Sequence, residues 1–539
     1  MPDRFIRRRD FLQLTAVGLG AIGSGGRVEP GRLPTASPPA DFELEEITIE
    51  ALQAAMANGR YTARSIAQLY LERIAELDRQ GPTVRSIIEL NPDGLSIADA
   101  ADAERRAGNV RGPLHGIPVL LKDNIDTADR MATSAGSLAL AGSHPPQDST
   151  VARKLREAGA IILGKTNLSE WANFRSTHSS SGWSGRGGQT RNPYVLDRNP
   201  CGSSSGSGAA IAANFASVAV GTETDGSIVC PANNCGLVGI KPTVGLVSRG
   251  GIIPISASQD TAGPMARSVS DAAILLTALQ GPDERDAATR APSARRQDFA
   301  TALVPGQLRG ARVGVARNFF GFNAAVDAVL DEALLALKSE GAVLVDPANM
   351  STAGQYDDDE FEVLLYEFKD GLNSYLAGLG ASSAVRNLAD LITFNERQKE
   401  REMPFFGQEI FQLAQEKGSL TTRAYRNALA RCRRLSRRQG IDALVARHRL
   451  DAIVAPTGGP AWTTDHLNGD HFTGGSSTPA AVAGYPAVTV PAGAVSGLPV
   501  GISFFGPAWS ELKLIGLAFG FEQATRHRKP PTFRPTTES

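Results

Sequence analysis

The sequence predicts an α/β fold in which helices pack on a sheet. Residues 149–159 have the composition of a helix that ends at Gly159, and the apolar run 160–163 follows it as a buried strand. The same order recurs between residues 312 and 345, where a helix lies between two short apolar runs. Strands that alternate with helices in this way are typical of a sheet covered by helices.

Composition places the chain among ordinary globular proteins. It has 539 residues, enough for one large core or two domains, with 42% hydrophobic and 21% charged residues. The formal net charge is −1, so the chain as a whole has no electrostatic attraction to nucleic acid or to an anionic membrane. The cysteines are Cys201, Cys230, Cys235 and Cys432. Their spacing indicates no metal site and demands no disulfide framework, although it leaves a Cys230–Cys235 bridge open.

The first residues have the pattern of an export signal. Residues 7–13 contain an Arg-Arg-x-Phe-Leu core similar to that of twin-arginine signals. The weakly apolar stretch 14–22 is well short of the ~20 residues that cross a bilayer, and 23–40 has the composition of a linker. We therefore expect a signal peptide and linker over residues 1–40, a periplasmic or secreted protein, and no stable membrane insertion after export. The alternative is a flexible basic tail.

Folded structure should begin near Glu45, and two regions are predicted as packing elements. Thr62 is expected to cap a helix whose apolar face begins at Ile66. Residues 351–440 are helix-rich and charged, and their apolar stripe from Phe361 to Leu376 fits a core, with part of it lining a substrate pocket as the alternative. The arginines of 431–438 are expected to form a solvated helix face paired with nearby acids.

Two Gly- and Ser-rich runs carry the candidate chemistry. Residues 201–208 are predicted to form a loop that leads into a helix near Ala209. Residues 221–228 form a second predicted loop, which follows the apolar strand 217–220 and precedes a short helix. Consecutive backbone N–H groups near a helix start can hold an oxyanion, so the serine that ends this second loop is a candidate nucleophile.

A lysine is the best candidate for the base that such a serine needs. None of the seven histidines has neighbours that indicate catalysis. Lys122 follows the apolar run 117–121 at the expected end of a buried strand. Burial disfavours the charged ammonium and lowers the lysine pKa, which prepares the side chain to accept a proton.

These motifs resemble the amidase signature family. The resemblance rests on the segment 116–124, the Ser-rich run 201–208 and Thr-Asp-Gly-Ser-Ile at 224–228, with further matches at 164–171 and 260–267. It covers about Gly112 to Asp271, and weaker similarity extends to 455–457 and 484–487. Within the family, the segments 189–194 and 222–231 are most similar to the peptide amidases of bacteria.

The resemblance implies a single domain over residues 45–530, with a signature core at 112–271 and a variable region at 351–440. Its fold is a large mixed β-sheet sandwiched between helices. The implied catalytic residues are Lys122, Ser203 and Ser227, with a cis peptide bond holding Ser203 between the other two. The backbone N–H groups of Thr224, Asp225, Gly226 and Ser227 are the implied oxyanion site. The reaction needs neither cofactor nor metal.

Each of these residues also has a simpler interpretation. Taken alone, Lys122 fits a surface lysine, Ser203 an ordinary loop serine and Ser227 a helix N-cap. Lys165 also follows an apolar strand, and its Thr-Asn-Leu-Ser context indicates a structural role. Residues 202–206 fit the G-x-S-x-G nucleophile elbow with Ser204 as nucleophile, but that elbow must follow a strand and residues 197–200 have loop composition.

The chain departs from the usual family pattern at five positions. Cys201 and Ser205 replace glycines, Glu223 replaces Asp, Asp225 replaces Gly, and Val229 replaces Arg. Our hypothesis is that the negative charge of Asp225 disfavours peptides that end in a carboxylate. The alternative is that Asp225 only supports its loop through backbone hydrogen bonds.

The resemblance therefore predicts a serine amidase that converts the C-terminal amide of a peptide to the free acid and ammonia. An amidase of small aryl or aliphatic amides is the first alternative, and a component of an amidotransferase that modifies aminoacyl-tRNA is the second. Export argues against the second, because translation partners are cytoplasmic. The expected partner is a small-molecule or peptide amide substrate and no nucleic acid, and the sequence does not specify an oligomeric state.

Overall fold

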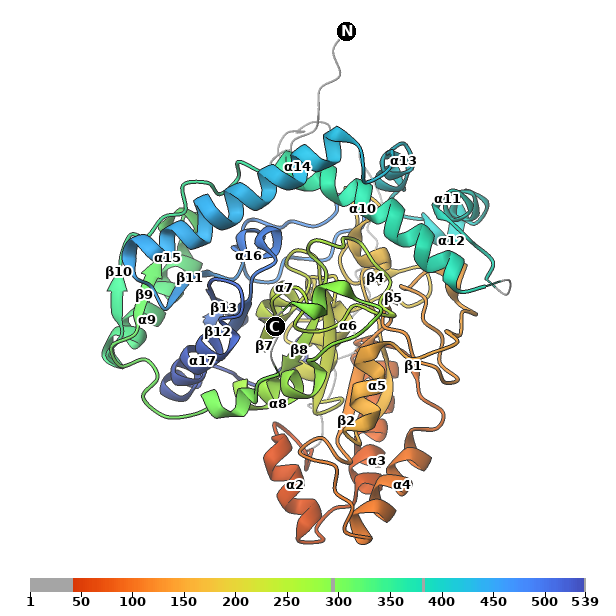
Figure 1. Cartoon of the computed structure of the whole chain (residues 1–539). Helices are drawn as coiled ribbons and strands as arrows, with labels where there is room; N and C mark the ends of the chain where they lie inside the picture. The colour runs from red at the N-terminus through yellow and green to blue at the C-terminus, as the bar shows by residue number, and fades with distance from the viewer. Residues whose placement is uncertain (1–41, 292–295, 381–382, 538–539) are drawn as a thin grey trace, which may run out of the picture.

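A mixed sheet of eleven strands runs through the part of the chain that the structure describes (Figure 1). The structure is a computed structural model, and it describes residues 42–291, 296–380 and 383–537. The predicted signal and linker at 1–40 lie outside these residues. In chain order the strands of this sheet are β1 (Ile87–Leu90), β2 (Pro118–Lys122), β3 (Ile161–Thr166), β6 (Val218–Glu223), β7 (Val238–Lys241), β8 (Thr261–Ala266), β9 (Arg312–Val315), β10 (Val343–Val345), β11 (Ala452–Pro456), β12 (Ala487–Val495) and β13 (Leu498–Phe505).

The strand order is β1-β3-β2-β6-β8-β7-β12-β13-β11-β9-β10. β2 is parallel to both of its neighbours, β3 and β6, and β9 is parallel to β10 and β11. The remaining pairs are antiparallel. The outer hairpin β4 (Trp183–Ser184) and β5 (Gly188–Gln189) forms a separate two-stranded sheet. The predicted large mixed sheet is thereby confirmed.

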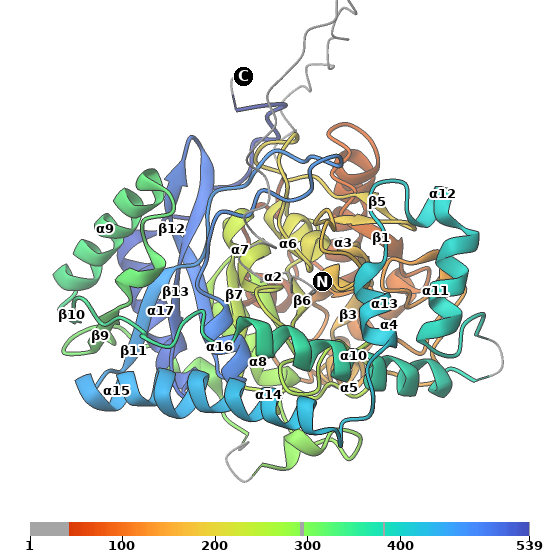
Figure 2. The same ribbon diagram turned by 90° about the horizontal axis from the view of Figure 1, so that it is seen from above.

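Helices cover the sheet, as Figures 1 and 2 show. The helices are α2 (Ile49–Ala57), α3 (Ala63–Arg73), α4 (Gly94–Arg106), α5 (Thr150–Glu157), α6 (Ser205–Ala212), α7 (Val229–Asn234), α8 (Val269–Leu279), α9 (Ala324–Ser339), α10 (Asp357–Gly378), α11 (Leu388–Arg397), α12 (Lys399–Glu402), α13 (Glu409–Gln415), α14 (Arg423–Arg433), α15 (Asp442–His448), α16 (Thr478–Ala483) and α17 (Glu511–Thr525). Helices α5, α8, α17 and α9 contact one another in that order along the sheet, whereas α6 and α7 pack together on β2, β6, β7 and β12.

The predicted local signals are largely confirmed. Thr62 caps α3 in a capping box with Ser65, and Ser149 caps α5. The parallel unit β9-α9-β10 occupies the second predicted α/β segment.

The glycine- and serine-rich run 201–208 differs from the prediction, because α6 begins at Ser205 within it. All residues of α6 are buried, and a Cβ on Gly206 would lie 2.4 Å from the carbonyl oxygens of Asn167 and Ser86. Small residues therefore let this helix pack closely against its neighbours, which outweighs their low helix propensity.

The variable region 351–440 is helical, as predicted. Figure 2 shows α10 and α14 side by side at one edge of the molecule, and the helix continues from α14 through a π-helical segment (Arg434–Ile441) into α15. The predicted stripe of α10 is buried at Leu365, Phe368, Leu372 and Leu376, where it packs on Ile253 and other residues of the signature core. The α10 helix therefore belongs to the same body as the candidate site.

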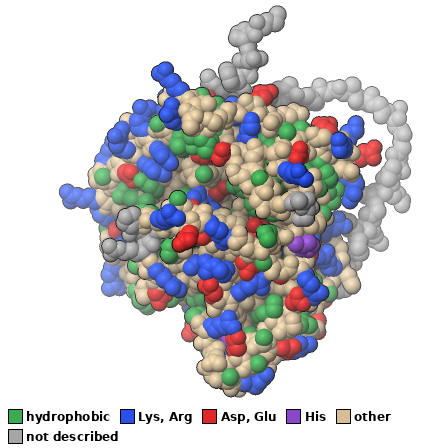
Figure 3. Space-filling view, turned by 45° about the vertical axis from the view of Figure 1, so that its right-hand side comes forward, with side chains coloured by type: hydrophobic (Ala, Val, Ile, Leu, Met, Phe, Trp, Pro, Cys, Tyr) green, Lys and Arg blue, Asp and Glu red, His purple; other side chains and the backbone are tan. Residues whose placement is uncertain are grey.

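Charged side chains of both signs are interspersed over the face shown in Figure 3. In the predicted basic run, Arg431 pairs with Asp359 of α10, which agrees with a solvated helix face. Within residues 42–291, 296–380 and 383–537, no helix is both long and apolar enough to cross a membrane.

Candidate active site

Lys122 lies at the end of β2 with its side chain fully buried. Its Nζ atom is 2.7 Å from Ser203 Oγ, 2.9 Å from Thr222 Oγ1 and 3.2 Å from the Thr222 carbonyl oxygen. Because β2 is flanked by β3 and β6, the strand carries the lysine to the centre of the sheet edge where the second Gly-rich loop begins. The prediction of a buried strand that ends in a lysine is confirmed.

Burial changes the protonation of this lysine. Loss of water lowers the pKa of Lys122 from 10.5 to about 7, and the negative charges of Asp260 and Glu223 oppose that shift. A neutral amine can accept the Ser203 hydroxyl proton while it donates to both oxygens of Thr222. The site therefore provides a base near neutral pH.

Ser203 follows a cis peptide bond with Gly202, as the resemblance implied. The Ser203 side chain is fully buried, and its carbonyl oxygen accepts a hydrogen bond of 3.1 Å from the Ser169 N–H. A Cβ on Gly202 would lie 2.1 Å from Ser169 Oγ, so only glycine fits before the serine.

The loop between β6 and α7 places Ser227 close to Ser203. The Glu223 carboxylate accepts hydrogen bonds from the N–H groups of Ile228 (2.7 Å) and Val229 (3.0 Å), which closes the loop around Ser227. The Ser204 N–H donates to the Ser227 carbonyl oxygen at 3.2 Å, which joins the two serine-bearing segments. Among the described residues, no hydrogen bond links the Ser227 hydroxyl to Ser203.

Backbone N–H groups of this loop are available to a ligand. Among the described residues, the N–H groups of Thr224, Gly226 and Ser227 donate to no protein acceptor. Gly226 has φ +79°, a left-handed conformation that suits glycine. The Asp225 carboxylate accepts hydrogen bonds from the hydroxyls of Ser477 (2.5 Å) and Thr478 (2.8 Å).

A small cavity of about 10 Å³ adjoins Ser203. Polar groups and three isoleucines form its wall. The lining residues are Asn124, Ala172, Ser203, Thr222, Glu223, Thr224, Arg249, Ile252, Ile253, Ile255, Asp260 and Thr261. The mixture of isoleucines with buried polar groups suits an amide whose acyl part is apolar.

Comparison with known proteins identifies the family. A family model described as Amidase matches residues 65–515. The chain belongs to the amidase family. The crystal structure of native peptide amidase from Stenotrophomonas maltophilia matches with a TM-score of 0.87 and 53% identity, over 92% of this chain and 100% of that chain. A probable amidase of Arabidopsis thaliana is 44% identical, over 91% of this chain and 92% of the relative. A glutamyl-tRNA(Gln) amidotransferase subunit of Acinetobacter baumannii is 35% identical, over 90% and 97%. This chain is therefore a hydrolase that acts on amides.

A disulfide joins the two serine-bearing segments of this amidase. Cys201 and Cys230 are bonded, with their Cα atoms 5.9 Å apart, and Cys235 and Cys432 are free and buried. The Cys230–Cys235 pairing that the spacing left open is wrong. Cys230 lies on α7 and Cys235 directly follows it. Five residues of helix turn the two side chains away from each other.

The structure rejects two rival residues of the amidase. The Ser204 hydroxyl donates to the Thr222 carbonyl at 3.1 Å and accepts from the Thr222 N–H at 3.2 Å, so it is engaged within the core. No strand precedes it among residues 190–202, contrary to the elbow motif. Lys165 binds the Ile125 carbonyl and Thr133 Oγ1 from the face of the sheet opposite to Lys122, which confirms its structural interpretation.

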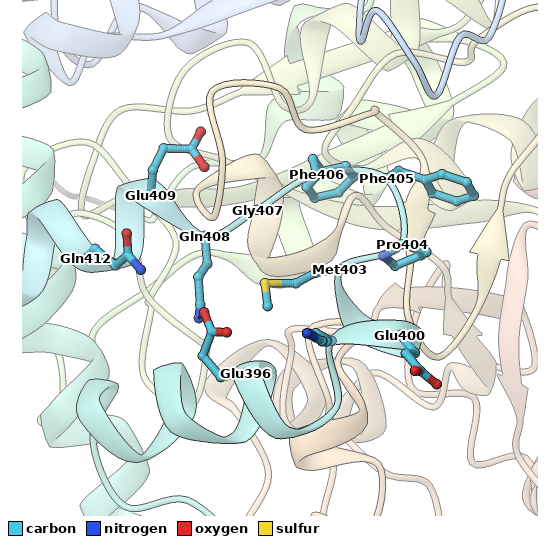
Figure 4. A pocket seen from close by; sticks show the side chains of 11 residues that line it. Glu396, Glu400, Met403, Pro404, Phe405, Phe406, Gly407, Gln408, Glu409 and Gln412 are labelled. Atoms are coloured by element: carbon cyan, nitrogen blue, oxygen red, sulfur yellow. Dashed lines mark hydrogen bonds between the residues drawn. The ribbon is translucent and has the colours of Figure 1, made fainter.

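A larger cavity of about 690 Å³ lies apart from these residues, among α11, α12 and α13 (Figure 4). Its lining side chains include Glu396, Met403, Phe405 and Gln412, and it shares no lining residue with the cavity beside Ser203. Among the described residues, no group of three or more His, Cys, Asp or Glu side chains is arranged to hold a metal ion.

Sequence reasoning missed three contributors to the site. Asn124 donates to Thr222 Oγ1 at 3.0 Å, and Asp260 accepts from Thr224 Oγ1 at 2.6 Å. Gln259 reaches the Thr224 carbonyl at 3.3 Å. Asn124 and Asp260 lie within segments that carried the family resemblance, and their position beside the motif residues was the only signal available.

Proposed function

We propose that this amidase hydrolyses the C-terminal amide of peptides to the free acid and ammonia. The observation that carries the proposal is the buried contact of 2.7 Å between Lys122 Nζ and Ser203 Oγ, beside the loop that bears Ser227. The substrate class is supported by the solved peptide amidase, which is 53% identical and aligned over its whole length.

In the proposed first step, Ser227 Oγ attacks the amide carbonyl carbon. Its proton passes to Ser203, whose own proton passes to neutral Lys122. The relay then returns a proton to the amide nitrogen, the carbon–nitrogen bond breaks, and ammonia leaves an acyl-enzyme ester on Ser227. The Ser227 side chain must turn toward Ser203 for this transfer, and unliganded active sites commonly have looser contacts than their substrate complexes.

The oxyanion of the tetrahedral intermediate is assigned to the N–H groups of the loop from Thr224 to Ser227, including Asp225 and Gly226. The Glu223 carboxylate supports this assignment, because it fixes the loop by binding two N–H groups beyond the serine. Loss of one such donor typically costs about 2.7–4 kcal/mol. Water then attacks the ester by the reverse relay, so the acid leaves and Ser227 regains its proton.

Selectivity for amides over free acids is assigned to Asp225. Two hydroxyls bind its carboxylate, an environment that favours the charged form. A negative charge next to the nucleophile repels a substrate or product that ends in a carboxylate, whereas a neutral C-terminal amide escapes this repulsion. The hydrogen bonds to Ser477 and Thr478 also make Asp225 a support of the loop, so the two roles are compatible.

The alternatives are small aryl or aliphatic amides and transfer of ammonia to aminoacyl-tRNA. The identity of 53% to the peptide amidase against 35% to the tRNA amidotransferase component favours the peptide substrate. Ammonia release from one peptide supplied as its C-terminal amide, compared with a simple aryl amide, separates the first two. The measurement uses the wild type, Ser227→Ala and, as a matched serine control, Ser374→Ala on the exposed side of α10.

Preference for the peptide amide, lost in Ser227→Ala and kept in Ser374→Ala, is the expected result. Preference for the aryl amide with the same dependence on Ser227 would keep the chemistry and refute the peptide substrate. Activity that survives Ser227→Ala would refute the nucleophile.

We further propose that the protein is exported by the twin-arginine route. The Cys201–Cys230 bridge supports this, because structural disulfides persist in oxidising compartments. Replacing Arg8 and Arg9 by Lys in the full chain should retain the protein in the cytoplasm of a bacterial host. Export of that variant at the wild-type level would contradict the proposal.

A further inference from the structure

A buried acid of the variable region binds the loop beneath the candidate site. Glu367 lies on α10 with only 3% of its surface exposed. Its Oε2 atom accepts hydrogen bonds from Ser256 Oγ (2.5 Å), the Ser258 N–H (2.9 Å) and Ser258 Oγ (2.9 Å). Its Oε1 atom accepts one from the Tyr425 hydroxyl of α14 at 2.6 Å. The carboxylate thereby joins two helices to the segment 255–260.

That segment holds the loop that bears Ser227. Asp260 Oδ2 accepts from the N–H groups of Ile255 and Ser256, each at 2.8 Å, which closes the segment into a compact turn. Asp260 Oδ1 accepts from Thr224 Oγ1 at 2.6 Å. Thr224 is the first residue of the proposed oxyanion loop, so the turn fixes that loop at its start.

A second contact runs in parallel to the first. Gln259 Nε2 donates to the Thr224 carbonyl oxygen at 3.3 Å and to Glu360 Oε1 at 3.0 Å. Glu360 lies one turn from the start of α10 and is 1% exposed. Both the hydroxyl and the carbonyl of Thr224 are therefore held by residues that α10 binds.

The same segment shapes the environment of the base. Asp260 and Ile255 line the cavity beside Ser203, and the negative charge of Asp260 faces Lys122 strongly enough to raise its pKa against the effect of burial. A shift of this turn would therefore alter the oxyanion donors, the cavity wall and the charge beside the lysine together.

We propose that Glu367 is a positioning residue for the hydrolysis reaction: through Ser256 and Ser258 it sets the position of Asp260 and hence of the oxyanion loop. This inference rests on the proposed function, and it makes α10 a working part of the catalytic apparatus. A displacement of about 1 Å in a catalytic group can lower a rate by about a hundredfold even when the mutation lies outside the reacting atoms.

The test compares Glu367→Gln with Glu362→Gln on the same helix. The glutamine of Glu367→Gln replaces one acceptor oxygen by an NH₂ group, which opposes donors that now bind the carboxylate. Glu362 is a matched control, because it pairs with Lys417 at 2.6 Å and its side chain is 32% exposed. Tyr425→Phe is the milder variant, since it removes one donor and keeps the carboxylate. Thermal unfolding first establishes which variants are folded.

The expected result for Glu367→Gln is a kcat lowered by about tenfold to a hundredfold with KM changed by less than about threefold. Glu362→Gln should match the wild type, and Tyr425→Phe should lower kcat by a smaller factor. A folded Glu367→Gln with wild-type kcat would overturn the inference. If Glu367→Gln does not fold, Tyr425→Phe decides it, and a wild-type kcat in that variant overturns it.

A second readout separates this inference from the proposed function. The rate at which phenylmethanesulfonyl fluoride labels Ser227 requires the nucleophile and its loop, but no amide substrate. If the wild type is not labelled at Ser227, the proposed function fails. If the wild type is labelled there and Glu367→Gln is labelled equally fast, the proposed function stands and the positioning role of Glu367 is wrong.

Discussion

The protonation of Lys122 should determine how the reaction depends on pH. Burial lowers the pKa of this lysine from 10.5 to about 7. At about 1.4 kcal/mol per pH unit, the buried site disfavours the ammonium by roughly 5 kcal/mol relative to water. About half of the enzyme therefore has a neutral lysine at pH 7, against roughly one molecule in three thousand for a lysine with its ordinary pKa.

The direction of the effect follows from the role of the base. Only neutral Lys122 can accept the proton, so activity is present above its pKa and is lost as the pH falls through it. The value of kcat/KM for a peptide amide, measured from about pH 5 to about pH 10, should rise with a single ionisation centred near pH 7. The midpoint should fall on warming, because deprotonation of an amine absorbs much heat whereas that of a carboxyl absorbs little.

Asp260 provides the control for this assignment. Burial raises the pKa of its own carboxyl to about 6, so it is the other group near the site that titrates in this range. Asp260→Asn removes a charge that favours the ammonium, and the midpoint should therefore move to lower pH. A midpoint that ignores both temperature and this substitution, or one above about pH 9, would refute the lysine as the base.

Three further predictions concern residues around the nucleophile. Ser203→Ala removes the bridging hydroxyl, so kcat should fall by about 10²–10⁴-fold with little change in KM, and a wild-type kcat would exclude the relay. Replacing Cys201 and Cys230 by serine opens a bridge between residues 29 positions apart, so the free energy of unfolding should fall by about 3–4 kcal/mol. Denaturant unfolding measures this, and equal stability in both proteins would show that the bridge does not form. Asp225→Asn should lower the inhibition constant of a free-acid peptide while the KM of the peptide amide stays the same. An unchanged inhibition constant would leave Asp225 with its structural role alone.

The sequence was sufficient for the catalytic candidates because their chemistry is encoded in contiguous motifs. Lys122 closes an apolar run, and Ser203 and Ser227 end or border Gly-rich loops, so each could be named from its neighbours. Their contacts confirm that Lys122 and Ser203 meet. The roles of the three residues in catalysis, and the domain limits at 45 and 530, stay predictions.

The features that the sequence did not reveal depend on contacts between distant segments. The Cys201–Cys230 bridge joins two loops that meet only because α6 and α7 pack together. The contact of Glu367 with Ser256 spans 111 positions, and a glutamate within a charged helix is normally a solvated residue. Local patterns hold no information on which buried donors such an acid will meet, so the support of the active site by α10 emerged only from the fold.

The nucleophile can be tested most directly by mapping a covalent label. The native protein is treated with phenylmethanesulfonyl fluoride, digested, and analysed by mass spectrometry to locate the modified serine. We predict modification of Ser227, with labelling that is lost in Ser227→Ala and slowed in the variant that replaces Lys122 by Met. A label on Ser203 or Ser204, or labelling that is independent of Lys122, would contradict the proposed relay.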